Sequence, residues 1–166
     1  PQSSNDEPIK MGRNAYALHE GYFNARYSDK MRFAITWECA GGPVSGSQDF
    51  RENVVPYWIE QYFKDDRYLV IDNKPVVGMY NVSKLMSYFG GSSAGVRAEL
   101  DYLRAACRDA GFDGCYVIMS NSNKGDAVNV EQAGFDGQYA YSWGMSSANI
   151  DVQKNGTFLE TIRMNL

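Results

Sequence analysis

Apolar positions along the chain follow two periods, one typical of helices and one typical of buried strands. Helical spacing recurs over three segments, at about residues 15–27, 50–63 and 96–110. In the last of these, Val96, Leu100 and Leu103 share one helix face. Short, nearly continuous apolar runs stand between the helical segments and are typical of strands buried in a parallel sheet. They predict four strands, at about residues 32–38, 75–81, 115–121 and 138–143.

The pentapeptide AGFDG occurs twice, at 110–114 and 133–137, and each copy stands between a predicted helix and a predicted strand. In each copy the first glycine is expected to end the helix in a left-handed cap, after which phenylalanine folds back and Asp-Gly turns the chain. Two consecutive helix-to-strand elbows indicate a β-α-β-α-β order and therefore a parallel sheet. The repeat is expected to be architectural, with any chemistry at the opposite, carboxyl ends of the strands.

The fold class predicted from this order is α/β, built from parallel-stranded βα repeats. With 166 residues the chain is long enough for one α/β domain, and its polar first residues, 1–12, are expected to form a loose segment. Two architectures fit: part of a (β/α)8 TIM barrel, or a small doubly wound sheet that serves as a binding or signalling module. The second should show a phosphate-binding glycine-rich loop, but Gly90-Gly91-Ser92-Ser93 follows a short predicted helix, at residues 83–89, rather than a strand.

Composition excludes several classes of function. The 20 acidic and 16 basic side chains give a net charge of −4 without a basic cluster, which argues against a nucleic-acid partner. No apolar run is long enough to span a membrane. A single histidine and three cysteines without ligand spacing argue against zinc, and the oxygens of Asn121, Asn123 and Asp126 lack a recognised calcium spacing. We therefore predict no cofactor and no metal, and leave a Cys107–Cys115 disulfide open.

Polar and aromatic residues gather where the predicted strands end. Carboxylate, amide, phenol and indole groups that converge at one edge of a parallel sheet would form a polar pocket with aromatic walls. A carbohydrate ring offers hydroxyls to the polar groups and an apolar C–H face to the rings, and the chain has 12 tyrosines and 3 tryptophans. The candidate substrate-binding residues are Trp37, Glu38, Tyr80, Asn81, Asn121, Tyr141 and Trp143.

Each of these candidates also has a structural explanation. Glu38 can cap a loop or bind a backbone amide, and the two tryptophans can be core residues. Asn81 and Asn121 belong to a residue type that turns favour for its own sake.

Three stretches of the chain resemble the glycoside hydrolase family 99-like proteins, a group that includes the endo-α-mannosidases and the WbsX-type proteins of bacterial polysaccharide loci. They are MRFAITWE (31–38), YFKDDRYLVIDNKPVVGMYN (62–81) and LRAACRDAGFDGCYVIMSN (103–121). The resemblance runs from about residue 15 to residue 143 and rests on the order and spacing of these stretches. It implies the central portion of a (β/α)8 barrel with a carbohydrate site on its carboxyl-terminal face, acting on a polysaccharide or glycan such as an α-mannoside.

The chain departs from this family in its acidic residues. The family has a later segment of the Asn-Glu-Trp type that supplies active-site acids, and Glu160 in FLETIRMNL does not match it. Glycosidases typically need two carboxyl groups. Glu38 is the best catalytic candidate, whereas Asp126 and Glu131 follow the third predicted strand and are poor substitutes.

Two functions remain open at the level of the sequence. The first is a fragment of a glycoside hydrolase-like barrel whose catalytic acids lie outside the chain and whose partner is the remainder of its own barrel. For such a substrate a periplasmic or secreted location is favoured. The alternative is a non-catalytic carbohydrate-binding α/β domain.

Overall fold

The computed structural model describes residues 17–39, 44–120 and 126–139. Short helical turns of 3-10 or π geometry are labelled η. The elements follow one another as η1 (Ala17–Tyr22), η2 (Ser28–Lys30), β1 (Ile35–Glu38), α1 (Ser47–Asp49), η3 (Phe50–Val54), α2 (Val55–Trp58), η4 (Ile59–Phe63), β2 (Val70–Ile71), β3 (Lys74–Tyr80), α3 (Val82–Tyr88), α4 (Ser93–Asp109), β4 (Tyr116–Ser120), α5 (Ala127–Ala133) and β5 (Gly137–Tyr139).

The sheet confirms the predicted parallel order. Its strands lie side by side as β1-β3-β4-β5, and each of these pairs is parallel. The short strand β2 pairs with the first residues of β3 as an antiparallel hairpin. Parallel strands that neighbour each other in chain order, with a helical connection between them, are the repeat from which a TIM barrel is built.

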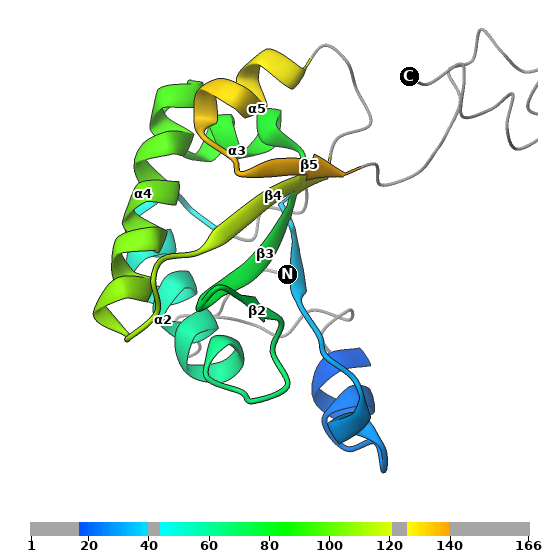
Figure 1. The fold of residues 1–166 in the computed structure, drawn as a ribbon. Helices are drawn as coiled ribbons and strands as arrows, with labels where there is room; N and C mark the ends of the chain where they lie inside the picture. The colour runs from blue at the N-terminus through cyan, green and yellow to red at the C-terminus, as the bar shows by residue number, and fades with distance from the viewer. Residues whose placement is uncertain (1–16, 40–43, 121–125, 140–166) are drawn as a thin grey trace, which may run out of the picture.

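Helices cover one face of this sheet. Figure 1 shows α2, α4 and α5 along the same side of the strands. The core lies between the two layers and includes Val77 and Met79 of β3 and Val117 and Met119 of β4, each at most 1% exposed. A doubly wound sheet carries helices on both faces. The described elements therefore have the one-sided arrangement of a barrel wall, which fits part of a TIM barrel better than a small doubly wound sheet.

The helix layer is held by an ion pair between a half-exposed arginine and a buried glutamate of its two long segments. Residues 47–63 run through α1, η3, α2 and η4 as one continuous helical stretch, and Arg51 of this stretch faces α4. Its guanidinium binds both carboxylate oxygens of Glu99, at 2.8 and 2.9 Å. Glu99 is only 3% exposed, so removing Arg51 would leave a buried charge without its partner.

The first AGFDG copy ends α4 as its sequence predicts. The amide of Phe112 donates to the carbonyl of Cys107 at 3.0 Å, and the amide of Gly111 donates to that of Arg108 at 3.0 Å. Gly111 has a φ of 97°, a backbone region that residues with a Cβ rarely adopt. This pair of bonds is the Schellman motif, which satisfies carbonyls at the helix end.

The second copy repeats this geometry at the end of α5. The amide of Phe135 donates to the carbonyl of Val130 at 3.4 Å, and that of Gly134 donates to Glu131 at 3.0 Å. Gly134 has a φ of 76°. Both phenylalanines are packed against the core. The same five residues therefore stop a helix and start a strand twice, which confirms the architectural interpretation of the repeat.

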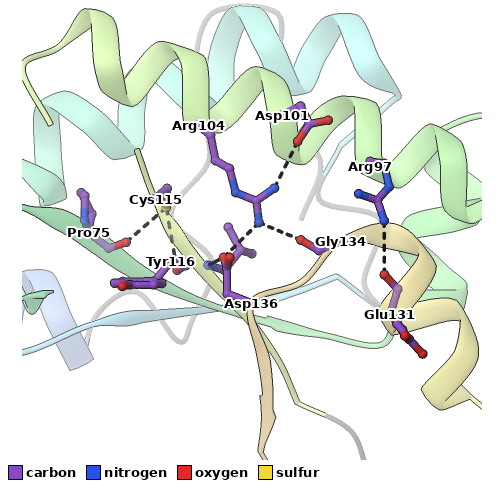
Figure 2. A network of polar contacts seen from close by, with 10 residues as sticks. Pro75, Arg97, Asp101, Arg104, Cys115, Tyr116, Glu131, Gly134 and Asp136 are labelled. Carbon is purple, nitrogen blue, oxygen red and sulfur yellow. Dashed lines mark hydrogen bonds and ion pairs between the residues drawn. The ribbon is translucent and has the colours of Figure 1, made fainter. Parts of the chain in front are cut away.

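The aspartate of each copy ties the elbow to the preceding strand. In the second copy the Asp136 amide donates to the Val117 carbonyl at 2.8 Å, and the Val117 amide donates back to Asp136 Oδ2 at 2.8 Å. Arg104 of α4 binds the same carboxylate oxygen at 2.9 Å and the Gly134 carbonyl at 2.7 Å (Figure 2). Asp136 thus acts as an extra rung of the ladder between β4 and β5.

The first copy uses a related pair beside β3. The Asp113 amide donates to the Asn73 carbonyl at 2.9 Å, and the Asn73 side-chain amide donates to Asp113 Oδ1 at 3.1 Å. Asn73 stands in the Asp-Asn-Lys-Pro turn and has a φ of 55°. Each aspartate therefore sets the position at which the next strand begins relative to the strand before it.

We expect Asp136→Ala to lower the free energy of unfolding by about 2–3 kcal/mol, because it removes a charged acceptor from a backbone amide and from Arg104. Asp101→Ala is the matched control. Asp101 also pairs with Arg104, at 3.2 Å, but its side chain is 62% exposed, so its loss should cost at most about 0.5–1 kcal/mol. Urea unfolding of the two variants measures the difference, and equal losses would contradict the role given to Asp136.

Candidate functional site

Four side chains form one row at the carboxyl edge of the sheet. Glu38 pairs in register with Tyr80, Tyr80 with Ser120, and Ser120 with Tyr139. Since side chains alternate between faces along a strand, residues paired in register point to the same face. We call these four residues the carboxyl-edge row. They bring a carboxylate, two phenols and a hydroxyl together.

The row points away from the helices. Trp37, the residue before Glu38, lies on the helix face, where its ring stacks on Phe50 at 5.5 Å and meets Trp58 edge-on at 5.3 Å. Glu38 is exposed, Tyr80 and Tyr139 are half-buried, and Ser120 is buried. The row therefore faces the side of the sheet that α2, α4 and α5 leave uncovered, which corresponds to the inside of a barrel.

Below the row, the first and last strands of the sheet meet across its inner face. The Tyr139 hydroxyl of β5 lies 3.4 Å from Thr36 Oγ1 of β1, although β3 and β4 stand between these strands. The two side chains meet over Gly78, where an added Cβ would lie 2.7 Å from Thr36 Oγ1 and 3.1 Å from the Tyr139 hydroxyl. The sheet is thus curved enough to close a floor beneath the row.

Cys39 holds the ends of β1 and β3 together. Its thiol donates to the Tyr80 carbonyl at 2.7 Å, and its own carbonyl accepts a hydrogen bond from the Tyr88 hydroxyl at 2.9 Å. Burial raises the pKa of the Cys39 thiol from 9.0 to about 12, so the thiol stays protonated and remains a donor. This contact keeps the backbone at Glu38 next to that at Tyr80.

Asn81 has a structural role as the cap of α3. Its φ of 72° is left-handed, and its Oδ1 accepts the Lys84 amide at 3.0 Å, which caps the start of α3. This is the structural explanation that turn chemistry offers for asparagine.

The structure brings two of the predicted residues together and places two elsewhere. Glu38 and Tyr80 are neighbours in the row. Trp37 is on the helix face, and Asn81 is a helix cap just beyond the strand. The remaining predictions, at Asn121, Tyr141 and Trp143, lie outside the described residues.

Sequence reasoning missed two members of the row, Ser120 and Tyr139. The prediction takes Asn121 in place of its neighbour Ser120, and the strand predicted at 138–143 places Tyr141 at the site. The described β5 spans Gly137–Tyr139, so Tyr139 is its last described residue. Strict alternation counted from Val117 and Met119, which are apolar and buried, would have assigned Ser120 to the opposite face.

The other acidic candidates are not part of the row. Asp126 accepts a hydrogen bond from Ser83 Oγ at 3.3 Å, and Glu131 is exposed on α5. In residues 17–39, 44–120 and 126–139 the structure has no group of three or more metal-ligating side chains.

All three cysteines are free and buried. Cys115 donates to the Pro75 carbonyl at 3.2 Å (Figure 2), and a hydrogen bond with Cys107 together with burial raises the pKa of Cys115. The Cys107–Cys115 pair, left open by the sequence, is therefore a pair of thiols in this structure. No helix among the described residues combines the length and apolar character needed to cross a membrane.

Residues 45–164 match the family described as glycosyltransferase WbsX. The chain belongs to the WbsX family. This match covers most of the stretch over which the sequence resemblance was seen, and it confirms that resemblance.

A solved structure of the GH99 endo-α-mannosidase from Bacteroides thetaiotaomicron superimposes on this WbsX-family chain with a TM-score of 0.50 at 15% sequence identity. The superposition covers 93% of this chain and 46% of the mannosidase. The chain thus spans about half the length of that protein, and its parallel βα repeats have the fold of part of a TIM barrel. No curated protein sequence matches the chain.

We expect Gly78→Ala to destabilise the chain by about 1–3 kcal/mol, since the new methyl group overlaps Thr36 and the Tyr139 hydroxyl. Gly137→Ala is the matched control in β5, another parallel strand of the same sheet, because a Cβ there would meet only Ile118, at an ordinary 3.7 Å. Its stability should change by no more than about 0.5 kcal/mol. Adding Thr36→Ala to Gly78→Ala should recover part of the loss in thermal unfolding. No recovery would show that the contact with Thr36 is not the cause.

Because the pKa of the Cys39 thiol is raised, the stability of the fold should depend on pH in the alkaline range. The unfolded thiol ionises near 9.0 and the folded one near 12, so above the lower value the unfolded state binds fewer protons and stability falls as pH rises. Between about pH 8 and about pH 10.5 the ionisation of this thiol in the unfolded state should lower the free energy of unfolding by about 2 kcal/mol. Cys39→Ser, which does not ionise, should show a correspondingly flatter decline in urea unfolding across that range. Parallel declines in both proteins would contradict the assignment.

Proposed function

We propose that this chain is part of a carbohydrate-active, glycoside hydrolase-like protein that binds a glycan along the carboxyl-edge row, with α-mannosides as the substrate class. The observation that carries the proposal is the row itself. A carboxylate, two phenols and a hydroxyl share one face at the carboxyl ends of parallel strands, and this is the end of a TIM barrel at which active sites are found. The family match and the fold of the endo-α-mannosidase point to the same class of ligand.

Within this site each group has a chemical task. Glu38 is exposed, so its carboxyl group can accept hydrogen bonds from sugar hydroxyls or take part in proton transfer. Tyr80 and Tyr139 are half-buried, and each offers a ring face to the C–H surface of a sugar and a hydroxyl to its oxygens.

Hydrolysis requires more than the described row provides. A glycosidase places two carboxyl groups about 5–5.5 Å apart for retention or about 6.5–9.5 Å apart for inversion. Glu38 is the carboxylate that the described residues contribute to the row. We therefore propose that the second acid is supplied by the remainder of the barrel, outside the residues described.

The two descriptions of related proteins name different reactions. One is a glycosyltransferase and the other an endo-α-mannosidase. Both reactions transfer a glycosyl group: a glycosyltransferase moves it from an activated donor to an acceptor hydroxyl, and a mannosidase moves it from a glycosidic bond to water. We favour the hydrolase because the fold is shared with that enzyme.

The alternative is a non-catalytic carbohydrate-binding domain. The observation that favours it is the same single carboxylate in the described row. In that case Glu38 would be a hydrogen-bond acceptor alone.

Yeast α-mannan is the first probe for this proposal. The 166-residue chain is expected to be retarded by α-mannan in affinity gel electrophoresis without releasing reducing ends, and Glu38→Gln should weaken the retardation. Glu52→Gln, which changes an exposed glutamate on the helix layer, is the control and should bind normally. If α-mannan does not retard the chain, the α-mannoside assignment is contradicted.

A protein that contains this chain within a complete barrel separates the enzyme from the binding domain. We expect it to hydrolyse α-mannan, with Glu38→Gln lowering kcat by roughly 100-fold or more if Glu38 transfers a proton. Binding without hydrolysis in that protein would favour the alternative.

A further inference from the structure

One member of the carboxyl-edge row has an unsatisfied polar atom. Ser120 is 4% exposed, and its hydroxyl oxygen has no hydrogen-bond partner in the described part of the chain. Buried hydroxyls are nearly always paired, since an unpaired one loses its hydrogen bonds to water without replacement. Among the buried side-chain oxygen and nitrogen atoms of the described residues, Ser120 Oγ is the one without a hydrogen-bond partner.

The position of this hydroxyl points to a ligand. Ser120 is paired in register with Tyr80 on one side and Tyr139 on the other, so its side chain lies on the inner face between two half-buried phenols. The neighbouring residue of the same strand, Met119, faces the helix core and is 1% exposed. A group that reaches Ser120 Oγ therefore comes from the open side of the sheet, where the proposed glycan lies.

We propose that Ser120 determines the specificity of this site by hydrogen-bonding one hydroxyl of a bound sugar ring, so that the site rejects a sugar that lacks that hydroxyl. The proposal rests on the proposed function. A serine hydroxyl donates one hydrogen bond and accepts others, as a sugar hydroxyl does, so the two groups match in either direction. A site with such a buried polar group discriminates strongly against an analogue that leaves the group unpaired.

The burial of Ser120 adds a condition. Its hydroxyl oxygen has almost no exposed surface in the unliganded chain, so the side chains around it move apart when the sugar binds. Removing the hydroxyl should then have opposite effects on the free and the bound protein. The free chain loses an unpaired polar group and becomes more stable, whereas the complex loses a hydrogen bond.

The test compares Ser120→Ala with Ser93→Ala in the full chain. Ser93 is also a buried serine, 8% exposed, but it lies on α4 and its hydroxyl pairs with Asn129 Oδ1 at 3.2 Å. We expect Ser120→Ala to raise Tm by about 2–4 °C and to weaken binding of methyl α-mannoside about tenfold, measured by NMR titration. Ser93→Ala should lower Tm and leave the affinity unchanged.

Monodeoxy sugars then identify the contact. The wild-type chain should bind one of the 2-, 3-, 4- and 6-deoxy derivatives of methyl α-mannoside at least about tenfold more weakly than the parent sugar. Ser120→Ala should bind that derivative and the parent sugar equally well, because the group that tells them apart is gone.

The outcomes separate this inference from the proposed function. If the wild-type chain binds methyl α-mannoside and Ser120→Ala retains both its affinity and its preference among the deoxy sugars, Ser120 is not the specificity residue, whereas the site stands. If the wild-type chain binds none of the five mannosides, the α-mannoside assignment fails and the role of Ser120 fails with it.

Discussion

Two reciprocal hydrogen bonds between Asp136 and Val117 fix where β5 begins beside β4, and the composition of the carboxyl-edge row depends on that register. Shifting a strand by one residue moves its side chains to the opposite face. Such a shift of β5 would turn Tyr139 toward the helices and bring Gln138 into its place beside Ser120. Arg104 reinforces the pair from the helix layer, so helix packing and strand register are set by one carboxylate (Figure 2).

Comparable contacts hold the other strands at both of their ends. At the amino end, the buried hydroxyl of Tyr68 donates to the Val76 carbonyl of β3 at 2.7 Å and accepts the Ile35 amide of β1 at 3.3 Å. At the carboxyl end the Cys39 thiol joins β1 to the Tyr80 carbonyl of β3. Polar contacts between side chain and backbone thus supplement a ladder whose strands are short.

Much of the fold could be predicted because its signals are local. The apolar runs identify the strands. The AGFDG sequence predicts the geometry of the elbow, since glycine and phenylalanine form the helix cap and aspartate reaches the adjacent strand. The site could be predicted only in part, because it depends on which face each residue takes at the last position of a strand. An error of one residue there exchanges Trp37 for Glu38 or Asn121 for Ser120. The unsatisfied hydroxyl of Ser120 has no sequence signal, since it arises from packing between strands.

The contact between Tyr139 and Thr36 also limits what can complete the barrel. It joins residues 103 positions apart through two hydroxyl groups, and both groups can donate and accept further hydrogen bonds. The inner face therefore presents these two hydroxyl groups beside the apolar side chain of Ile118, which pairs in register with Gly78. A segment that packs against this part of the inner face has to supply hydrogen-bonding side chains or retain water there. A purely apolar lining would leave these hydroxyls with unsatisfied hydrogen-bonding capacity. The inner face below the site is consequently of mixed polarity, and any segment that packs against it has to fit both the two hydroxyls and Ile118.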